Sequence, residues 1–111
     1  YLKSFKSQRH QDLPLILPTE MAHCWHTWNQ FTIRVMDGKR DALQAHLKKY
    51  EIASEIYYPL SLHQQECFRD LPAMPCHVSE RLAKECLSLP IYPELSRKMQ
   101  DEVVEVVTDF L

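Results

Sequence analysis

The segment 56–63, Ile-Tyr-Tyr-Pro-Leu-Ser-Leu-His, gathers the side chains of this sequence that are best suited to contact a polar ligand. Successive side chains of a strand face opposite sides, so one of Tyr57 and Tyr58 should pack and the other should be presented. Pro59 lacks an N–H and should end the strand, which puts His63 on the loop beyond it. Two phenols and an imidazole there could bind a polar ligand, but the residues alone favour a packed strand edge.

Three further polar residues, Asn29, Gln30 and Arg34, fall within a stretch rich in aromatic and β-branched residues. A polar group on a buried strand face must be hydrogen-bonded, either within a structural network or to a ligand. The structural network is the favoured interpretation of these residues.

A possible nucleophile and base, Cys67 and His63, are spaced so that they could meet on one helical turn. The sequence indicates no oxyanion hole and no third orienting group for them, so we expect a buried, inert Cys67 beside Phe68. The other close pairs, Cys24 with His26 and Cys76 with His77, do not match the spacing of structural zinc sites. The four cysteines are therefore interpreted as core thiols, reduced in a cytosolic protein.

The composition limits the possible classes of function. The 111 residues carry a net charge of −2 and 45% hydrophobic side chains, which fits one globular domain and argues against nucleic-acid binding. Gly38 is the single glycine, and this excludes a glycine-rich phosphate loop. We see no membrane-spanning run and no export signal, and the first residue, Tyr1, suggests excision from a longer polypeptide.

The hydrophobic pattern predicts a two-layer α/β domain in which strands and helices alternate. Residues 1–12 are expected to be the tail of a helix, and the proline-bracketed residues 13–18 an edge strand or connector. Residues 26–36 predict a strand with one buried face, formed by Asn29, Phe31, Ile33 and Val35. A turn at 37–39 should then lead into an amphipathic helix whose core face is Leu43, Ala45, His46, Leu47 and Tyr50.

The second half of the chain predicts a short strand at 53–58, one or two helical turns at 64–70 and a helix at 77–87. The inward positions of that helix are expected to be Val78, Leu82, Ala83, Cys86 and Leu87. Residues 89–93 should be extended. Ser96 is a plausible N-cap for a last helix, 97–111, that buries Met99, Val103, Val106, Val107, Phe110 and Leu111.

Four segments, in unbroken order, resemble one known family. They are 28–31 (WNQF), 40–43 (RDAL), 56–65 (IYYPLSLHQQ) and 87–95 (LSLPIYPEL). Together they resemble the C-terminal part of the DegT/DnrJ/EryC1/StrS sugar aminotransferases, which are pyridoxal-phosphate (PLP) enzymes. The resemblance extends over nearly the whole chain from about residue 13.

The resemblance implies a fold of the aspartate-aminotransferase type, in which a large N-terminal domain binds PLP and a small α/β C-terminal domain follows it. Residues 1–12 would be the tail of the connecting helix, and residues 13–111 the small domain, with a short, mostly antiparallel sheet packed against helices. Family members move an amino group, typically from glutamate, to a nucleotide-linked keto sugar. They work as homodimers with active sites at the subunit interface.

The resemblance also implies that this segment shapes the substrate cleft and does not perform the chemistry. None of its lysines lies in a context that matches the Schiff-base lysine, so no catalytic residue and no cofactor site are expected within it. Tyr57, Tyr58 and His63 would be substrate-side contacts, with Asn29 and Gln30 as weaker candidates. PLP would bind elsewhere in the longer parent protein, which we expect in the cytoplasm, without nucleic-acid or membrane partners.

Two departures from the family pattern bear on this reading. The loop at 70–75 is short and glycine-free, and Ser61 stands where the family usually has a second proline. One alternative is a free-standing binding module that keeps the fold without the chemistry. Another is a dehydratase branch of the same family, in which histidine replaces the lysine.

Overall fold

A three-stranded antiparallel sheet forms the centre of the computed structural model, which describes residues 1–6, 13–72 and 75–111. Its order is β1 (Leu15–Ile16), β2 (Phe31–Val35) and β3 (Cys86–Leu89). The helices are α1 (Leu2–Phe5), α2 (Arg40–Lys49), α3 (His77–Glu85) and α4 (Arg97–Phe110). Two 3-10 turns, Leu62–Gln64 and Glu66–Phe68, precede α3. The predicted α/β fold with a short antiparallel sheet packed against helices is confirmed.

One face of the sheet carries the hydrophobic core. The side chains of β2 alternate as predicted, with Phe31, Ile33 and Val35 buried and the residues between them partly exposed. Leu43 and Leu47 of α2 are also fully buried in this cluster, which residues of α4 complete. The opposite face of the sheet bears Thr32 and Arg34, which are partly exposed.

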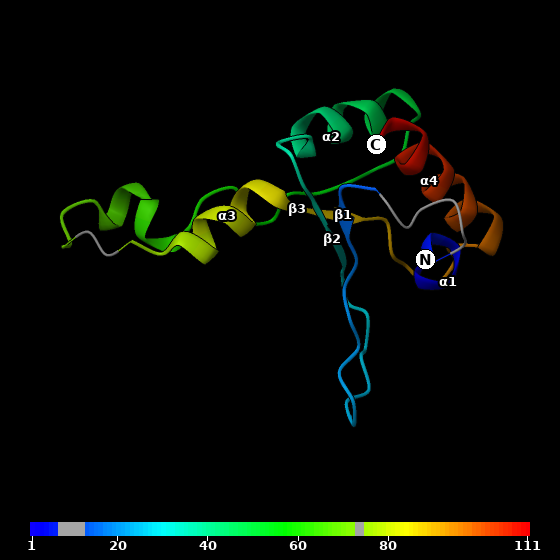
Figure 1. The fold of residues 1–111 in the computed structure, drawn as a ribbon, viewed down its shortest axis with the longest axis horizontal. Coiled ribbons are helices and arrows are strands. Elements are labelled where there is room, and N and C mark those ends of the chain that lie inside the picture. The colour runs from blue at the N-terminus through cyan, green and yellow to red at the C-terminus, as the bar shows by residue number, and fades with distance from the viewer. Residues whose placement is uncertain (7–12, 73–74) are drawn as a thin grey trace.

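Two parts of the chain project from this body in different directions (Figure 1). The connection between β1 and β2 forms a narrow arm, on which the side chain of Trp25 is 94% exposed. The second projection contains the two 3-10 turns and α3, and it returns to the body where α3 runs into β3.

The predicted strand at 26–36 is correct only in its second half. Trp28 has a φ of 52°, in the left-handed region, and Asn29 and Gln30 are exposed. A strand cannot continue through such a backbone conformation, so β2 begins at Phe31. The expectation that Asn29 lies on a buried strand face is therefore wrong.

The predicted helix at 77–87 is too long by two residues. α3 ends at Glu85, and Cys86 adopts an extended conformation that starts β3. Residues 86–89 pair with residues 31–34 of β2. This non-local pairing overrides the helical spacing of Cys86 and Leu87, while residues 90–93 lie outside any strand.

The predicted strand at 53–58 reduces to one bridge between Glu55 and Ser88. No other residue of that segment pairs with a described strand, so the alternation argument does not apply to Tyr57 and Tyr58, which are both exposed. Several expected core positions are exposed in the structure, one of them on the projecting part of the chain and three at α2 and α4. These exposed positions are Ala45, Tyr50, Val78 and Met99.

Other predictions for the ends of the chain are confirmed. Leu15–Ile16 is an edge strand, and Ser96 is the N-cap of α4, with its Oγ accepting a hydrogen bond from the Met99 N–H at 3.2 Å. The expected helix tail at 1–12 is α1 in its first part, and residues 7–12 lie outside the described residues. Within the described residues, every helix is too short or too polar to cross a membrane.

Candidate functional site

A groove of about 1080 Å³ lies between the sheet and the second projection. The lining atoms are mostly apolar, as in pockets that bind small molecules. It is formed by residues of β2, β3 and α3, by the residues just before β2 and α3, and by the segment 55–65. These residues are Gln30, Thr32, Glu55, Ile56, Tyr57, Tyr58, Leu60, Ser61, Leu62, Gln65, Pro75, Cys76, His77, Val78, Ser79, Leu82, Ala83, Cys86 and Ser88.

The floor of the groove is the face of the sheet that does not bear the core. Thr32 and Ser88 are register partners on β2 and β3, and their hydroxyl oxygens are 2.8 Å apart in a hydrogen bond. Cys86 lies two residues before Ser88 on the same face of β3. Burial raises the pKa of its thiol. Among the residues that line the groove, the floor therefore presents two hydrogen-bonded hydroxyls and a protonated thiol.

One wall is the segment that begins at Glu55. The Glu55 N–H donates to the Ser88 carbonyl at 3.0 Å, and the Ser88 N–H donates to the Glu55 carbonyl at 2.9 Å. This bridge fixes the base of the wall to the sheet. Beyond it, Tyr57 and Tyr58 line the groove with 52% and 78% of their surfaces exposed, so both phenols are accessible.

The other wall is α3, which is held at its C-terminal end by two arginines. The Arg34 Nη2 atom lies 2.7 Å from Glu85 Oε2, in a partly buried ion pair. Arg40 is 7% exposed, and its Nη1 atom donates to the carbonyls of Ala83 and Cys86 at 3.1 and 3.2 Å. These bonds satisfy carbonyls that the end of a helix leaves without partners.

The structure brings together three of the five residues for which the sequence predicted substrate contacts. Tyr57, Tyr58 and Gln30 line the groove, whereas Asn29 and His63 stand beside lining residues without lining it themselves. The His63 Nε2 atom lies 2.9 Å from Glu80 Oε1 on α3. The role of all five in binding substrate stays a prediction.

Ser61 is a lining residue that the sequence pattern singled out only as a departure from the family. The residue is 4% exposed and is the N-cap of the 3-10 turn, where it has the geometry of a capping box with Gln64, but its buried Oγ atom makes no direct hydrogen bond among the described residues. Its N–H donates to the Gln64 side chain at 3.3 Å, which shapes the 3-10 turn.

Ser61→Ala should leave the domain equally stable or stabilise it by up to about 1 kcal/mol, because it removes a buried polar group without a partner. Native-state hydrogen exchange of the amides in 62–68 would measure the change. Ser88→Ala is the matched control, since that hydroxyl is bonded to Thr32, and it should destabilise by about 1 kcal/mol. A destabilising Ser61→Ala would show that the hydroxyl has a partner in the folded protein.

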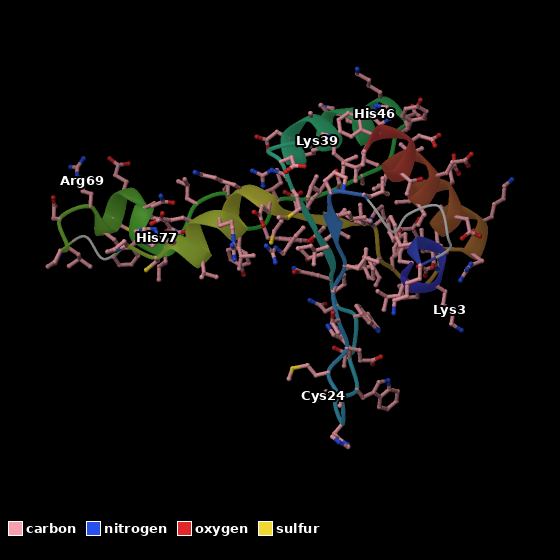
Figure 2. All side chains as sticks on the ribbon, viewed as in Figure 1. Lys3, Cys24, Lys39, His46, Arg69 and His77 are labelled. Atoms are coloured by element: carbon pink, nitrogen blue, oxygen red, sulfur yellow. The ribbon has the colours of Figure 1, made fainter. Side chains whose placement is uncertain are left out.

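Within the described residues, no hydrogen bond joins Cys67 to His63, whose Nε2 atom lies 2.9 Å from Glu80 Oε1 instead. Cys67 is exposed, and so are Cys24 and Cys76, so the expectation of core thiols holds only in part for Cys86. The burial of Cys67 was predicted from its neighbour Phe68, but on the 3-10 turn that carries both, Cys67 is exposed and Phe68 is only partly buried. Figure 2 shows Cys24 on the arm and His77 on the other projection, far from each other. In the described ranges, no group of three or more potential metal ligands is assembled.

The groove also offers no anchor for PLP. A lysine that forms the internal aldimine must reach the cofactor, and none of the lining residues is a lysine. Lys39 lies elsewhere, where its Nζ atom donates to the Leu111 carbonyl at 3.2 Å. Figure 2 shows Lys3 and Lys39 on the body of the domain, away from α3. Among the described residues that line the groove, none could therefore form the covalent bond to the cofactor.

Comparison with known protein families finds one that matches nearly the whole chain. The profile of the DegT/DnrJ/EryC1/StrS aminotransferase family matches residues 3–108. A crystal structure of a DegT DnrJ EryC1 StrS aminotransferase from Brucella abortus has a similar fold, with a TM-score of 0.80 and 32% sequence identity. The match covers 97% of this chain and 27% of that structure.

Two curated relatives are similar in sequence. A pleiotropic regulatory protein from Geobacillus stearothermophilus is 43% identical over 98 residues, which are 86% of this chain and 26% of the relative. A UDP-N-acetyl-3-dehydro-alpha-D-glucosamine 3-aminotransferase from Acidithiobacillus ferrooxidans is 40% identical over 95 residues, 86% of this chain and 25% of the relative. The chain thus spans about a quarter of the length of the relatives it matches.

Proposed function

The chain belongs to the DegT/DnrJ/EryC1/StrS aminotransferase family, and from this membership we propose that it is the small C-terminal domain of a PLP-dependent sugar aminotransferase. The proposed reaction moves an amino group, with glutamate as the donor, to a nucleotide-linked keto sugar. The relative named as a UDP-sugar aminotransferase supports this substrate class. Residues 1–12 would join the domain to a large N-terminal domain, in a cytoplasmic homodimer.

The groove is the observation that supports the domain's role in this reaction. It combines an apolar lining with two accessible phenols, the Gln30 amide and the floor hydroxyls, which suits the sugar or the nucleobase of such a substrate. Tyr57, Tyr58 and Gln30 are the proposed substrate contacts. Asn29 and His63, which are adjacent in sequence to the lining residues Gln30 and Leu62, are further proposed substrate contacts.

The proposed roles of the two domains of the parent protein differ, because no lysine lines the groove of this domain. PLP supplies the electron sink for amino transfer when it is bound to a lysine. We assign that lysine to the large domain, because the groove has none. In this proposal the domain binds and orients the sugar nucleotide, shields it from water and is inactive on its own.

Tyr58→Ala tests the proposal in the intact protein that contains residues 1–111. Because stacking on an aromatic ring contributes about 1–3 kcal/mol per base, we expect KM for the nucleotide-linked keto sugar to rise about tenfold. The KM for glutamate should not change. Steady-state assays of amino transfer would measure both constants.

Tyr50→Ala is the matched control, since Tyr50 is also exposed but lies at the end of α2, away from the groove. It should leave both constants unchanged. Equal effects of the two substitutions would contradict the placement of the sugar nucleotide in the groove.

The second candidate is a non-catalytic binding module with the same fold. Two observations support this candidate. One relative is named as a pleiotropic regulatory protein, and no lysine is among the residues that line the groove. In that case the intact protein would bind sugar nucleotides through the groove and show no amino transfer with any donor.

A further inference from the structure

The two walls of the groove are joined at the end that lies away from the sheet. His63, on the 3-10 turn Leu62–Gln64, places its Nε2 atom 2.9 Å from Oε1 of Glu80 on α3. The contact spans 17 residues of sequence, so it is a tertiary link. Both side chains are about three-tenths exposed, at 30% and 27%.

This pair is the only hydrogen bond or ion pair between residues 55–65 and α3 in the part of the chain that the structure describes. The base of the groove is fixed separately by the Glu55–Ser88 bridge and the Arg34–Glu85 ion pair. Figure 1 shows that the N-terminal part of α3 extends away from the sheet. The distance between the walls at that end therefore depends on the contact between His63 and Glu80.

Neither His63 nor Glu80 lines the groove, but residues within two positions of each of them do. Leu62 and Gln65 line one side, and Val78 and Ser79 line the other. A change in the contact between His63 and Glu80 would thus move lining side chains from both walls. A residue in this position influences a ligand through geometry and does not need to touch it.

The surroundings of Glu80 favour its ionised form, which must accept the hydrogen bond that His63 donates. The pKa of Glu80 is lowered, chiefly by the hydrogen bond from His63 and next by the Cys76 N–H, which donates to Oε1 at 3.3 Å. His77 is the other titratable group nearby, with its Nδ1 atom 3.9 Å from Glu80 Oε2.

We propose that His63 and Glu80 form a latch that sets the width of the groove, and that His63 is a positioning residue for the sugar nucleotide. This inference rests on the proposed function and refines the assignment of His63 to the substrate side. His63 acts through Glu80, so the two residues must be energetically coupled in ligand binding.

A double-mutant cycle in the intact protein tests this coupling, with UDP-N-acetylglucosamine as the probe and calorimetry as the measurement. His63→Leu and Glu80→Leu should each weaken binding about fivefold, the size expected for one hydrogen bond. The double variant should bind no more weakly than either single variant. His63→Gln keeps a donor at the same reach and should recover most of the affinity.

Glu66→Leu is the matched control for the removal of a carboxylate, because Glu66 is exposed and does not line the groove. It should leave the affinity unchanged. If His63→Leu weakens binding equally with and without Glu80, His63 touches the ligand directly and the latch is wrong.

A measurement without ligand separates the latch from the proposed function. In His63→Leu, the amides of 62–65 and 76–80 should exchange faster, while those of α2 should not change. The pKa of the Glu80 carboxyl, followed by NMR, should rise towards its ordinary value. If the probe does not bind but both changes occur, the latch stands and the sugar-nucleotide proposal fails. Unchanged exchange and an unchanged pKa would overturn the latch.

Discussion

Leu87→Ala is expected to destabilise the domain by about 2–5 kcal/mol, the range observed when a fully buried leucine is truncated. Leu87 has no exposed surface and faces the core from β3, opposite Ile33 of β2. The substitution removes apolar contacts and leaves a cavity that the sheet cannot close without shifting its register.

The effect of Leu87→Ala is best measured by native-state hydrogen exchange in the intact protein, because a multidomain protein gives no single free energy of unfolding. The opening free energies of the β2 amides should fall by the full amount. Leu71→Ala is the control, since Leu71 is 62% exposed, and it should change them by less than about 0.5 kcal/mol. Similar losses in both variants would contradict the placement of the core.

Arg40→Met should destabilise the junction between α3 and β3 by about 2–4 kcal/mol. Methionine keeps the apolar stem but removes the donors to the Ala83 and Cys86 carbonyls, which are left without these bonds. Asp41, whose carboxylate accepts a hydrogen bond from Arg40 Nε, also loses its partner. We therefore expect the amides at the end of α3 and the start of β3 to exchange faster, and those of α4 much less.

Arg40→Lys separates charge from geometry at this position. A lysine keeps the positive charge but cannot reproduce the planar set of donors with which the guanidinium bridges these groups. It should therefore recover less than half of the loss in opening free energy. A fully stable Arg40→Lys variant would show that charge alone holds the junction, and an unaffected Arg40→Met variant would show that the two carbonyl contacts do not matter.

Elements whose position is determined by the local spacing of apolar and capping residues could be predicted from the sequence. The spacing of Val103, Val106 and Val107, with Ser96 as the N-cap, was enough to place α4. The alternation of Phe31, Ile33 and Val35 was enough to find the buried face of β2. In both cases the residues that determine the element are close together in the chain, and the periodicity is unambiguous.

The end of α3 could not be predicted in the same way. Leu82, Ala83, Cys86 and Leu87 keep a helical spacing, and no glycine or proline separates helix from strand. The boundary is set by pairing with β2 and by the buried Arg40, which lies more than forty positions away in the sequence. Local propensity carries no information about such partners.

The candidate site was found in part. The proline-bounded segment with Tyr57 and Tyr58 indicated the wall, although by an argument about strand alternation that the structure does not support. The contact of His63 with Glu80 and the unpartnered hydroxyl of Ser61 depend on how the wall folds against α3. Residue types at those positions gave no signal of either feature.

The groove between α3 and segment 55–65 is the proposed binding site of the sugar nucleotide. The most direct test is hydrogen exchange of the intact protein with and without saturating UDP-N-acetylglucosamine. We predict slower exchange in 55–65 and 76–83, with residues 41–49 of α2 unchanged. Binding that leaves both groove segments unprotected, or no binding at all, would contradict the claim.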